Sequence, residues 1–434
     1  MKRVTQRTLL STAIALAAFQ AHGAGFQISE HSTSGLGRAF AGEAAIADNA
    51  AVAVRNPAAM TMFDSAQVSG GLSFIQPDVD AKVNTVGASP ADAPVFSATT
   101  TSQHEDVAPD AIVPYFHYVR PINETSALGF STFSNFGLAT EYPSNSVAGA
   151  IAGQTELLTI DFNLNYAHRI NEQLSLGAGL NAVYADASLT RNAGAAILAA
   201  PTTEVAHLEG DGWGYGWNIG ALWEINEDHR LGASYRSKVD ITLDGEYRGL
   251  ATTYVSKPGQ TVPGELELNL PDIFEFSGYH KVASKWAVHY SAMMIGWSSF
   301  QELRATSSNT NCGSSPGSFD GICLQKDEKW EDSWRYALGA THYLNNEWTL
   351  RAGVALDESP VPDSHRTLSI PDTERTWYTL GATYQPSENL SFDGGFAYLN
   401  GDSVTGSETE GGTTFTFEAG GDAYIIAVGA NYTF

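Results

Sequence analysis

The sequence predicts an all-β protein: a transmembrane antiparallel β-barrel of about 14 strands with an N-terminal hatch, or plug, inside its lumen. Three observations lead to this prediction. They are an export signal, side chains that alternate between apolar and polar, and short turns that alternate with long connections. The predicted organisation is a signal peptide over residues 1–23, a hatch over 24–64 and a 14-stranded outer-membrane barrel over 65–434.

The N-terminus has the three parts of a secretory signal peptide. Basic residues at positions 2, 3 and 7 precede an apolar stretch over residues 9–18, and Ala21-His22-Gly23 supplies the small-residue cleavage pattern. No stretch of about 18 apolar residues follows, so we expect no transmembrane helix. The net charge of −25 argues against nucleic acid as a partner, because phosphate contacts need clustered Lys and Arg.

Alternating side chains predict strands that each have one apolar and one polar face. The pattern is clear over residues 160–166, 231–243, 348–356 and 424–434. Over residues 231–243 we expect Val239, Ile241 and Leu243 to share the face of Tyr235, because successive strand side chains point to opposite faces. A soluble β-sandwich alternates in the same way, so the period alone does not distinguish the two folds.

The lengths of the connections between strands distinguish a membrane barrel from a soluble sandwich. Short turns are predicted near residues 121–125, 170–173, 226–228, 282–285, 345–347 and 386–389. Between them lie long polar connections near residues 76–110, 141–156, 190–210, 246–264, 304–325, 358–372 and 400–420. Short turns on one side and long loops on the other are typical of bacterial outer-membrane barrels, which have even strand numbers. The predicted location is therefore the outer membrane of a Gram-negative bacterium.

Aromatic residues near strand ends support this location. Aromatic girdles mark the two membrane interfaces of such barrels. We expect girdle positions at Trp213, Trp286, Trp297, Trp348, Trp377 and Tyr432. The chain ends on an aromatic residue, Phe434, at the end of its last predicted strand.

The residues after the signal peptide do not fit the strand pattern. Residues 34–47 are rich in small side chains, Asn56-Pro57 would break a strand, and the first clear strand begins near Gln67. Irregular backbone at membrane depth must be enclosed by protein or water. We therefore expect residues 24–64 to lie inside the lumen.

Several motifs, in order along almost the whole mature chain, carry a family resemblance. They are AGFQ (24–27), SGLGRAF (34–40), AIAD (45–48), RNPA (55–58), SNFGLATE (134–141), WGYGWN (213–218), LNLP (268–271) and SPVP (359–362). The chain resembles the FadL family, the long-chain fatty acid transporters of Gram-negative outer membranes. The resemblance implies uptake of long-chain fatty acids by passive, ligand-gated diffusion.

The resemblance also implies a binding pocket. In the family an Arg and a Lys hold the ligand carboxylate, and Arg191 and Lys326 match these positions in context. A planar guanidinium and an ammonium are suited to a carboxylate. Phe26, at the mature N-terminus, is expected to reach the same pocket, so that binding there could move the hatch.

A lateral opening is implied as well. The family's third strand has an inward kink, which falls on residues 134–140 here and includes Ser134, Asn135 and Gly137. We expect Gly137 to permit an unusual backbone and the hatch segment Asn56-Pro57-Ala58 to lie beside the kink. Ligand would leave sideways into the membrane, which spares an acyl chain roughly 0.8 kcal/mol per CH₂ kept from water.

Two features depart from the family or extend it. The loops over residues 192–206 and 248–264 look short for an outer capture groove, whose apolar surface would come from Ala193, Ala195, Ala196, Ile197, Leu198 and Tyr254. Cys312 and Cys323 lie in a Gly- and Ser-rich segment, and in an oxidising compartment a local disulfide is expected.

Three other functions are compatible with an exported β-barrel. Neutral hydrocarbons such as monoaromatics are the main alternative substrates, and they would not need the two cations. A general porin is disfavoured by the hatch. A lipase would need a serine paired with His207 or His365, which the sequence does not indicate. We expect no catalytic residues, cofactor or metal, and a monomer surrounded by outer-membrane lipid and lipopolysaccharide.

Overall fold

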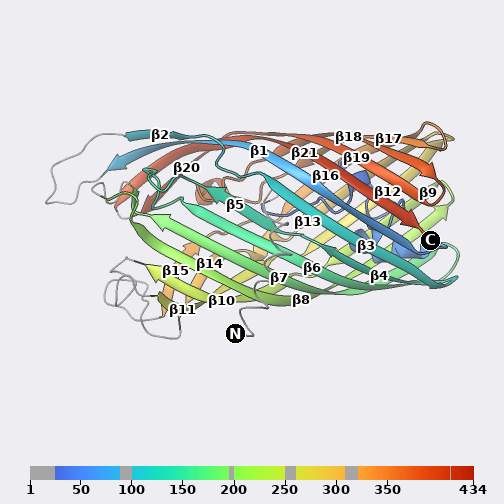
Figure 1. Ribbon diagram of the computed structural model, residues 1–434, viewed down its shortest axis with the longest axis horizontal. Helices are drawn as coiled ribbons and strands as arrows, with labels where there is room; N and C mark the ends of the chain where they lie inside the picture. The colour runs from blue at the N-terminus through green and yellow to red at the C-terminus, as the bar shows by residue number, and fades with distance from the viewer. Residues whose placement is uncertain (1–24, 88–99, 195–199, 250–260, 308–320, 411) are drawn as a thin grey trace.

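The computed structural model describes residues 25–434 except 88–99, 195–199, 250–260, 308–320 and 411. The chain forms a long, closed antiparallel barrel (Figure 1). Closure is made by the first and last strands, β1 (Gln67–Gly87) and β21 (Thr413–Thr433), which pair along all 21 residues of β1. A closed barrel leaves no strand edge unpaired in lipid.

The described strands form 14 antiparallel crossings, so the predicted fold class is confirmed. In chain order the crossings are β1, β2 (Thr100–His104) with β3 (Ala111–Asn123), β4 (Ser126–Phe133) with β5 (Gly137–Glu141), β6 (Gln154–Arg169), β7 (Leu174–Asn192), β8 (Glu204–Asn226), β9 (His229–Arg236) with β10 (Val239–Gly249), β11 (Thr261–Leu270) with β12 (Ile273–Ala283), β13 (Trp286–Ile295) with β14 (Glu302–Thr306), β15 (Ile322–Asp327) with β16 (Ser333–Tyr343), β17 (Trp348–Asp357), β18 (Arg375–Ser387), β19 (Leu390–Gly401) with β20 (Val404–Glu410), and β21.

All six predicted short turns join consecutive strands at the expected places. The long connections are shorter than predicted, because strands continue into them. β1 runs to Gly87 and β20 lies within residues 400–420, both of which were expected to be loop. In the extension of β1, Val79, Ala81 and Val83 are buried and alternate with exposed polar residues, so a strand pattern is present there. β20 carries polar side chains on both faces, so it shows no alternation although its backbone pairs with β21.

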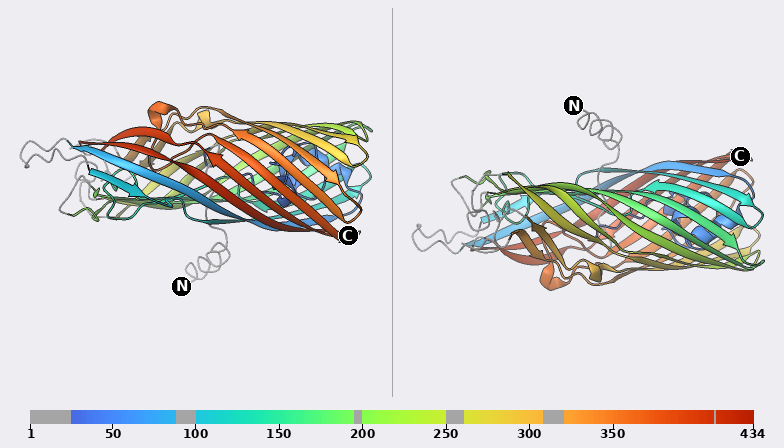
Figure 2. Two further views of the ribbon diagram at one scale, coloured as in Figure 1. Left: turned by 90° about the horizontal axis from the view of Figure 1, so that it is seen from above. Right: turned by 90° about the horizontal axis from the view of Figure 1, so that it is seen from below.

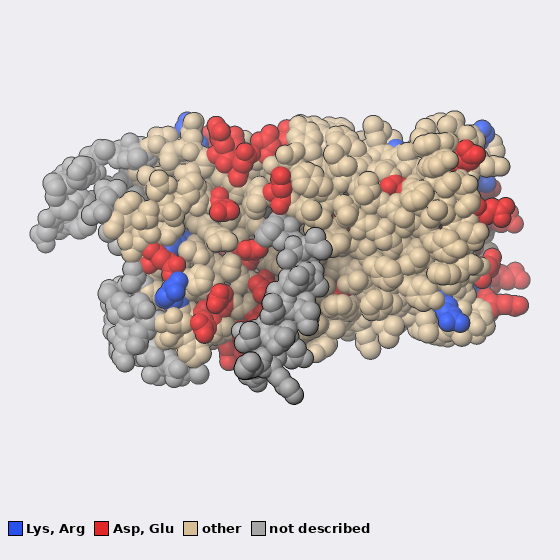
Figure 3. All heavy atoms as spheres, viewed as in Figure 1, with Lys and Arg blue, Asp and Glu red and all other residues tan. Residues whose placement is uncertain are grey.

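On the membrane-facing part of β6, the distribution of polarity is the reverse of that in a soluble protein. On β6, Leu164 is 58% exposed, while Asn163 and Asn165 are buried inside the barrel. On the face seen in Figure 3, acidic residues gather on the half that carries the long loops and at the opposite end, with a band almost free of charge between them. This band has the character of the apolar belt of a membrane barrel.

Two of the expected girdle residues are not in the girdle. Trp213, Trp286, Trp348 and Tyr432 are exposed on the outer surface as predicted, but Trp297 and Trp377 are buried. Trp297 lies in η3 (Trp297–Ser299), a break between β13 and β14, and packs into the apolar core of the lumen. Trp377 points inward from β18 and packs against Phe40 of the hatch. Inward and outward tryptophans are not distinguishable by residue type.

The segment over residues 231–243 does not keep one apolar face. Tyr235 of β9 lies on the outer face against Trp217, whereas Val239, Ile241 and Leu243 of β10 are buried in the lumen. The pairs Asn218–Arg236 and Asp211–Asp244 enclose six residues of β8 (212–217) but seven of the opposite strand (237–243). The extra residue is a β-bulge, and it reverses the faces that follow.

The hatch lies inside the barrel, in the half nearer the C-terminus, as Figure 2 shows for the blue N-terminal segment. It contains three short helical segments, α2 (Thr33–Leu36), α3 (Val52–Arg55) and η1 (Pro57–Met62), and a further one, η4 (Asp363–His365), lies in an external loop. Within the described residues, no helix is long and apolar enough to cross a membrane.

Buried ion pairs tie the hatch to itself and to the wall. Arg38 pairs with Glu43 at 2.6 Å and with Asp48 at 2.8 Å, and Asp48 also lies 3.5 Å from Arg351 of β17. Arg55 lies 3.9 Å from Glu275 of β12. An enclosed, charge-paired N-terminal region is what a plug requires, because buried charges need partners.

Candidate functional site

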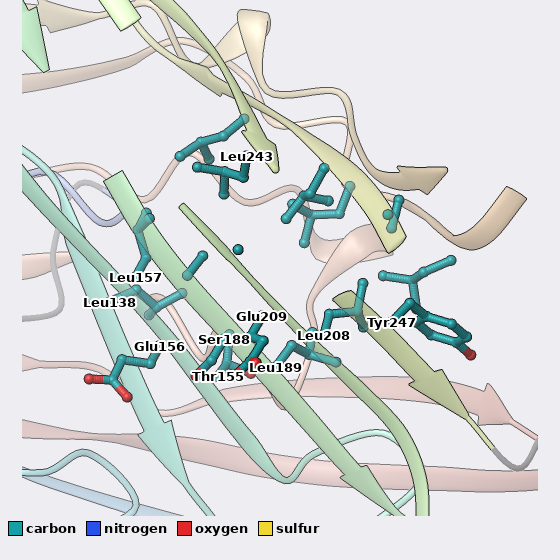
Figure 4. Close-up of a pocket in the computed structure, with 18 of the residues that line it drawn as sticks. Leu138, Thr155, Glu156, Leu157, Ser188, Leu189, Leu208, Glu209, Leu243 and Tyr247 are labelled. Atoms are coloured by element: carbon teal, nitrogen blue, oxygen red, sulfur yellow. The ribbon is translucent and has the colours of Figure 1, made fainter. Parts of the chain in front are cut away.

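An apolar cavity lies inside the barrel, between the wall and the start of the hatch. It contains about 820 Å³ of space free of atoms, part of it open to solvent. Figure 4 shows leucine side chains from neighbouring strands around this space, among them Leu157 of β6, Leu189 of β7, Leu208 of β8 and Leu243 of β10. Such a cavity is suited to a long apolar ligand.

Phe26 closes the hatch side of this apolar cavity. Its side chain is 1% exposed and lines the cavity. Around it lie Trp297, Phe300 and Trp330, whose ring centroids are 4.5, 5.5 and 5.6 Å from that of Phe26. Edge-on aromatic packing of this kind fixes the ring in place. The N-terminal phenylalanine is therefore in direct contact with the space that a ligand would occupy.

Arg191 lies at the margin of the apolar cavity rather than in its lining. The guanidinium is buried and donates to Gln154 O at 3.0 Å, to Thr190 O at 3.0 Å and to Thr155 Oγ1 at 3.2 Å. Thr155 itself lines the cavity, as does Leu189 two residues before the arginine. Among the described residues, no carboxylate lies within 4.0 Å of Arg191, so its charge is not neutralised by a direct ion pair.

Lys326 occupies a similar marginal position on the other side. Its Nζ lies 2.9 Å from Glu408 Oε2, and Glu408 Oε1 accepts a hydrogen bond from Leu368 N at 2.7 Å. Leu324, two residues before the lysine, lines the cavity. The structure thus places both predicted cations beside one apolar space. The ammonium group of Lys326 is already ion-paired with Glu408.

Two carboxylates near the cations were not predicted from the sequence. Arg191 interacts electrostatically with both Glu408 and Glu328, and Glu328 also interacts with Lys326. Glu328 lies in the connection between β15 and β16 and is 1% exposed, and this burial raises its pKa to about 7. Glu328 is only two residues from Lys326, but Glu408 is 82 residues away, so no local pattern could have indicated it.

The barrel wall is interrupted at the predicted kink. Residues 134–136 separate β4 from β5, and among the described strands β5 pairs only with β6. The facing part of β3, residues 111–115, pairs with β1 on its other side, and its pairing with β4 begins only at Phe116. The ladder between the second and third crossings is therefore missing beside the apolar cavity.

The N-terminus of the hatch is hydrogen-bonded to this interruption. Ile28 N donates to Asn135 O at 2.9 Å, and Gly137 N donates to Phe26 O at 2.8 Å. Gln27 forms an isolated bridge with Phe136. Ser134 Oγ donates to Thr159 O at 2.7 Å, which holds the break against β6. Residues 26–28 thus form a short strand, the N-terminal strand, that adds to the broken edge.

The backbone at Gly137 differs from the expectation, whereas Pro57 of the Asn56-Pro57-Ala58 segment lines the same small cavity as Asn135 of the kink. Gly137 begins β5 and its φ is not in the left-handed region, so its backbone does not require glycine. Asn56 Nδ2 donates to Ala221 O of β8 at 2.9 Å, and a side chain at Gly220 would overlap Asn56 Oδ1. The segment packs against β7 and β8, whereas residues 26–28 contact the kink directly.

Two other expectations fall partly outside the described residues. Cys312 lies there, while Cys323 is buried and disulfide-bonded. Of the expected capture-groove residues, Ala193 is buried, and Ala195, Ala196, Ile197, Leu198 and Tyr254 lie outside the described residues.

Comparisons with known proteins agree with this geometry. A family model described as "Outer membrane protein transport protein (OMPP1/FadL/TodX)" matches residues 14–434. The chain belongs to this family. It is therefore an outer-membrane β-barrel of a Gram-negative bacterium, in a family of transport proteins rather than enzymes.

Several curated FadL-family proteins are similar over their whole length. The chain is 40% identical over 463 residues to the long-chain fatty acid transport protein of Escherichia coli O6:H1, covering 100% of this chain and 99% of that protein. It is 38% identical over 477 residues to outer membrane protein P1 of Haemophilus influenzae, covering 100% of each.

Solved structures share the fold. A Pseudomonas aeruginosa FadL homologue matches with a TM-score of 0.81 and 22% identity, covering 95% of this chain and 100% of that chain. The Pseudomonas putida toluene transporter TodX matches with a TM-score of 0.64 and 15% identity, covering 96% and 99%.

Proposed function

We propose that this FadL-family protein takes up long-chain fatty acids through the outer membrane by passive, ligand-gated diffusion. The observation that carries the proposal is the apolar cavity with two cations at its margin, Arg191 and Lys326. An acyl chain fits the leucine-lined space, and a carboxylate fits the charged margin. Full-length relatives named as long-chain fatty acid transport proteins support the same substrate.

Binding of the carboxylate competes with Glu408 in this mechanism. Without ligand, Glu408 neutralises Lys326. A fatty acid carboxylate placed between Lys326 and Arg191 would take over that role and would gain the buried guanidinium of Arg191 as a second partner. A neutral ligand of the same length gains nothing from the exchange.

Gating follows from the position of Phe26. A ligand that fills the apolar cavity pushes against this ring, which belongs to the N-terminal strand bonded to the kink. Displacing that strand removes the two backbone hydrogen bonds that cover the broken edge of β5. The acyl chain can then leave between β3 and β5 into the membrane. One closed barrel suffices for this route, so we infer that the unit of transport is a monomer in outer-membrane lipid and lipopolysaccharide.

The test compares a fatty acid with neutral ligands on the purified barrel. Oleate, oleyl alcohol and toluene are titrated while intrinsic fluorescence is followed, with Trp297 and Trp330 beside Phe26 as reporters. We expect oleate to bind much more tightly than the alcohol. The double variant Arg191→Ala/Lys326→Ala should weaken oleate binding by at least about 100-fold, since each charged hydrogen bond contributes roughly 1.5–3 kcal/mol.

A matched control removes two cations at the same end of the barrel but outside the cavity. Arg248 pairs with Glu204 at 2.7 Å and Lys329 with Asp327 at 2.6 Å, both on the exposed surface. Arg248→Ala/Lys329→Ala should leave oleate binding unchanged. Equal binding of acid and alcohol, insensitive to Arg191 and Lys326, would contradict the proposal and favour neutral hydrocarbons as substrates.

A further inference from the structure

A second, polar cavity lies beneath the N-terminal strand. It contains about 390 Å³ of space free of atoms, part of it open to solvent, and is formed by the hatch, the kink and the wall. The hatch supplies His31 and Arg55, the kink supplies Asn135, and β9 supplies Arg236. Val54 and Ile273 add apolar surface. We call this space the inner cavity.

Two buried polar atoms, on residues that line the inner cavity, have no hydrogen-bond partner among the described residues. They are Asn135 Nδ2 and His31 Nδ1, on residues that are 3% and 2% exposed. Buried polar groups in native proteins are almost always satisfied by protein, water or ligand. A polar group bound in this cavity would satisfy them.

Arg55, Arg236 and Glu275 line the inner cavity and carry its charges. Arg236 donates to Val54 O at 3.0 Å and to Asn181 Oδ1, and among the described residues it has no carboxylate within 4.0 Å. Arg55 faces two carboxylates, Glu43 at 3.6 Å and Glu275 at 3.9 Å, so its charge is already matched. Asp161 attracts Arg236 only from a greater distance. Arg236 is therefore the cation with charge available to a ligand.

The N-terminal strand runs from the apolar cavity toward the inner cavity. Phe26, at the start of the strand, lines the apolar cavity, and His31, just beyond its end, lines the inner one. Two residues of the kink line these spaces: Leu138 lines the apolar cavity, and Asn135 lines the inner cavity. A ligand that displaces the N-terminal strand from the kink would bring the two spaces together.

We propose that the inner cavity is a second binding site for the carboxylate of an alkyl carboxylic acid, held by Arg236 and the Asn135 amide. The proposal rests on the proposed function, because it takes the fatty acid as the ligand. The carboxylate accepts from the guanidinium and from Asn135 Nδ2, while Val54 and Ile273 contact the first methylenes. The ligand occupies this site after passing Phe26, while its chain leaves through the wall.

The two sites can be resolved by nuclear magnetic resonance on the folded, full-length barrel with oleate labelled with ¹³C at the carboxyl carbon. At excess oleate the wild type should show two bound carboxyl signals. Arg236→Gln and Asn135→Leu should each weaken one of them by at least about tenfold in affinity. Arg191→Ala/Lys326→Ala should remove the other signal.

Arg335→Gln is the matched control. Like Arg236, Arg335 is a wall arginine that donates to a hatch carbonyl, Ala39 O at 3.1 Å, and stacks on an aromatic ring, Trp377 at 4.8 Å. It does not line the inner cavity. This variant should keep both signals, and each variant is first checked for the heat-dependent gel mobility of a folded barrel.

The outcomes separate the two proposals. A single bound signal, lost in Arg191→Ala/Lys326→Ala and unaffected by Arg236→Gln and Asn135→Leu, would overturn the second site and leave fatty acid binding intact. Loss of a signal in Arg335→Gln as well would also overturn the second site, since it would show a general disturbance of the hatch. Absence of any bound signal in the wild type would overturn both proposals.

Discussion

At the scale of single residues, Arg191 and Lys326, the two cations proposed to bind the ligand carboxylate, lie close to carboxylates of the protein. A bound ligand must displace these carboxylates or lie beside them. Glu408 holds Lys326 at 2.9 Å, and Glu328 is buried close to both cations. The sequence predicted the two cations through the family resemblance. It could not indicate Glu408, because the contact depends on how β20 folds over β15 from a distant part of the chain.

Glu408→Gln should strengthen oleate binding. The substitution keeps the shape and the possible hydrogen bond to Leu368 N but removes the negative charge that competes for Lys326. We expect an increase of about threefold to tenfold in affinity for oleate, since a partly exposed pair contributes roughly 1 kcal/mol. Oleyl alcohol binding should not change. Calorimetric titration of both ligands measures the difference. A weaker oleate complex would show that Glu408 helps Lys326 to bind the ligand instead of competing with it.

The raised pKa of Glu328 should make oleate binding depend on pH. Burial raises this pKa to about 7, so the carboxyl group is neutral below pH 7 and negatively charged above it. A charged Glu328 repels the bound carboxylate, and affinity should therefore fall by about threefold to tenfold from pH 6 to pH 8. Glu328→Gln should remove most of this dependence. A pH profile identical to that of the wild type would exclude Glu328 as its source.

At the scale of elements, the N-terminal strand links the apolar cavity to the kink. Gly25 precedes this strand with φ +69°, and a side chain there would come within 2.6 Å of Trp330 and 2.7 Å of Trp297. Only glycine combines this backbone with such close contact. The sequence showed a small residue before Phe26 but not the reason for it, since both tryptophans come from the far wall.

Gly25→Ala should therefore dislodge Phe26. The added methyl group strains the backbone by about 1 kcal/mol and collides with the two indole rings. We expect a red-shifted tryptophan emission and weaker oleate binding, measured together by fluorescence titration. Gly394→Ala is the control, because a side chain at Gly394 meets nothing within 4 Å. Wild-type emission and affinity in Gly25→Ala would show that the aromatic cluster adjusts freely.

The elements also show where sequence patterns lose information. Alternation located the strands that face lipid, because lipid demands one apolar face. It failed over residues 231–243, where a bulge turns Val239 and Ile241 into the lumen without interrupting the apolar period. It also failed at β20, where polar residues on both faces give no period. Register and bulges depend on the neighbouring strand, which one strand's sequence does not describe.

At the scale of the whole molecule, the hatch has two roles. It blocks the lumen, and its N-terminal strand pairs with the interrupted part of the barrel wall. Its ion pairs reach β17 through Arg351 and β12 through Glu275, while its N-terminal strand completes the broken edge at β5. The barrel itself closes without the hatch, through the pairing of β1 with β21. These two roles predict opposite effects when the hatch is absent.

Removal of residues 24–64, with the signal peptide kept, tests the two roles together. An empty lumen should admit hydrophilic solutes, so single-channel conductance should rise from near zero to that of an open barrel. Oleate uptake should fall, because Phe26 and residues 26–28, which line the apolar cavity and cover the lateral gap, are lost. Gel mobility of the unheated protein verifies that the shortened chain still forms a barrel. If oleate uptake instead rose together with conductance, the acid would be crossing through the lumen, and the gap between β3 and β5 would be a structural irregularity rather than the exit.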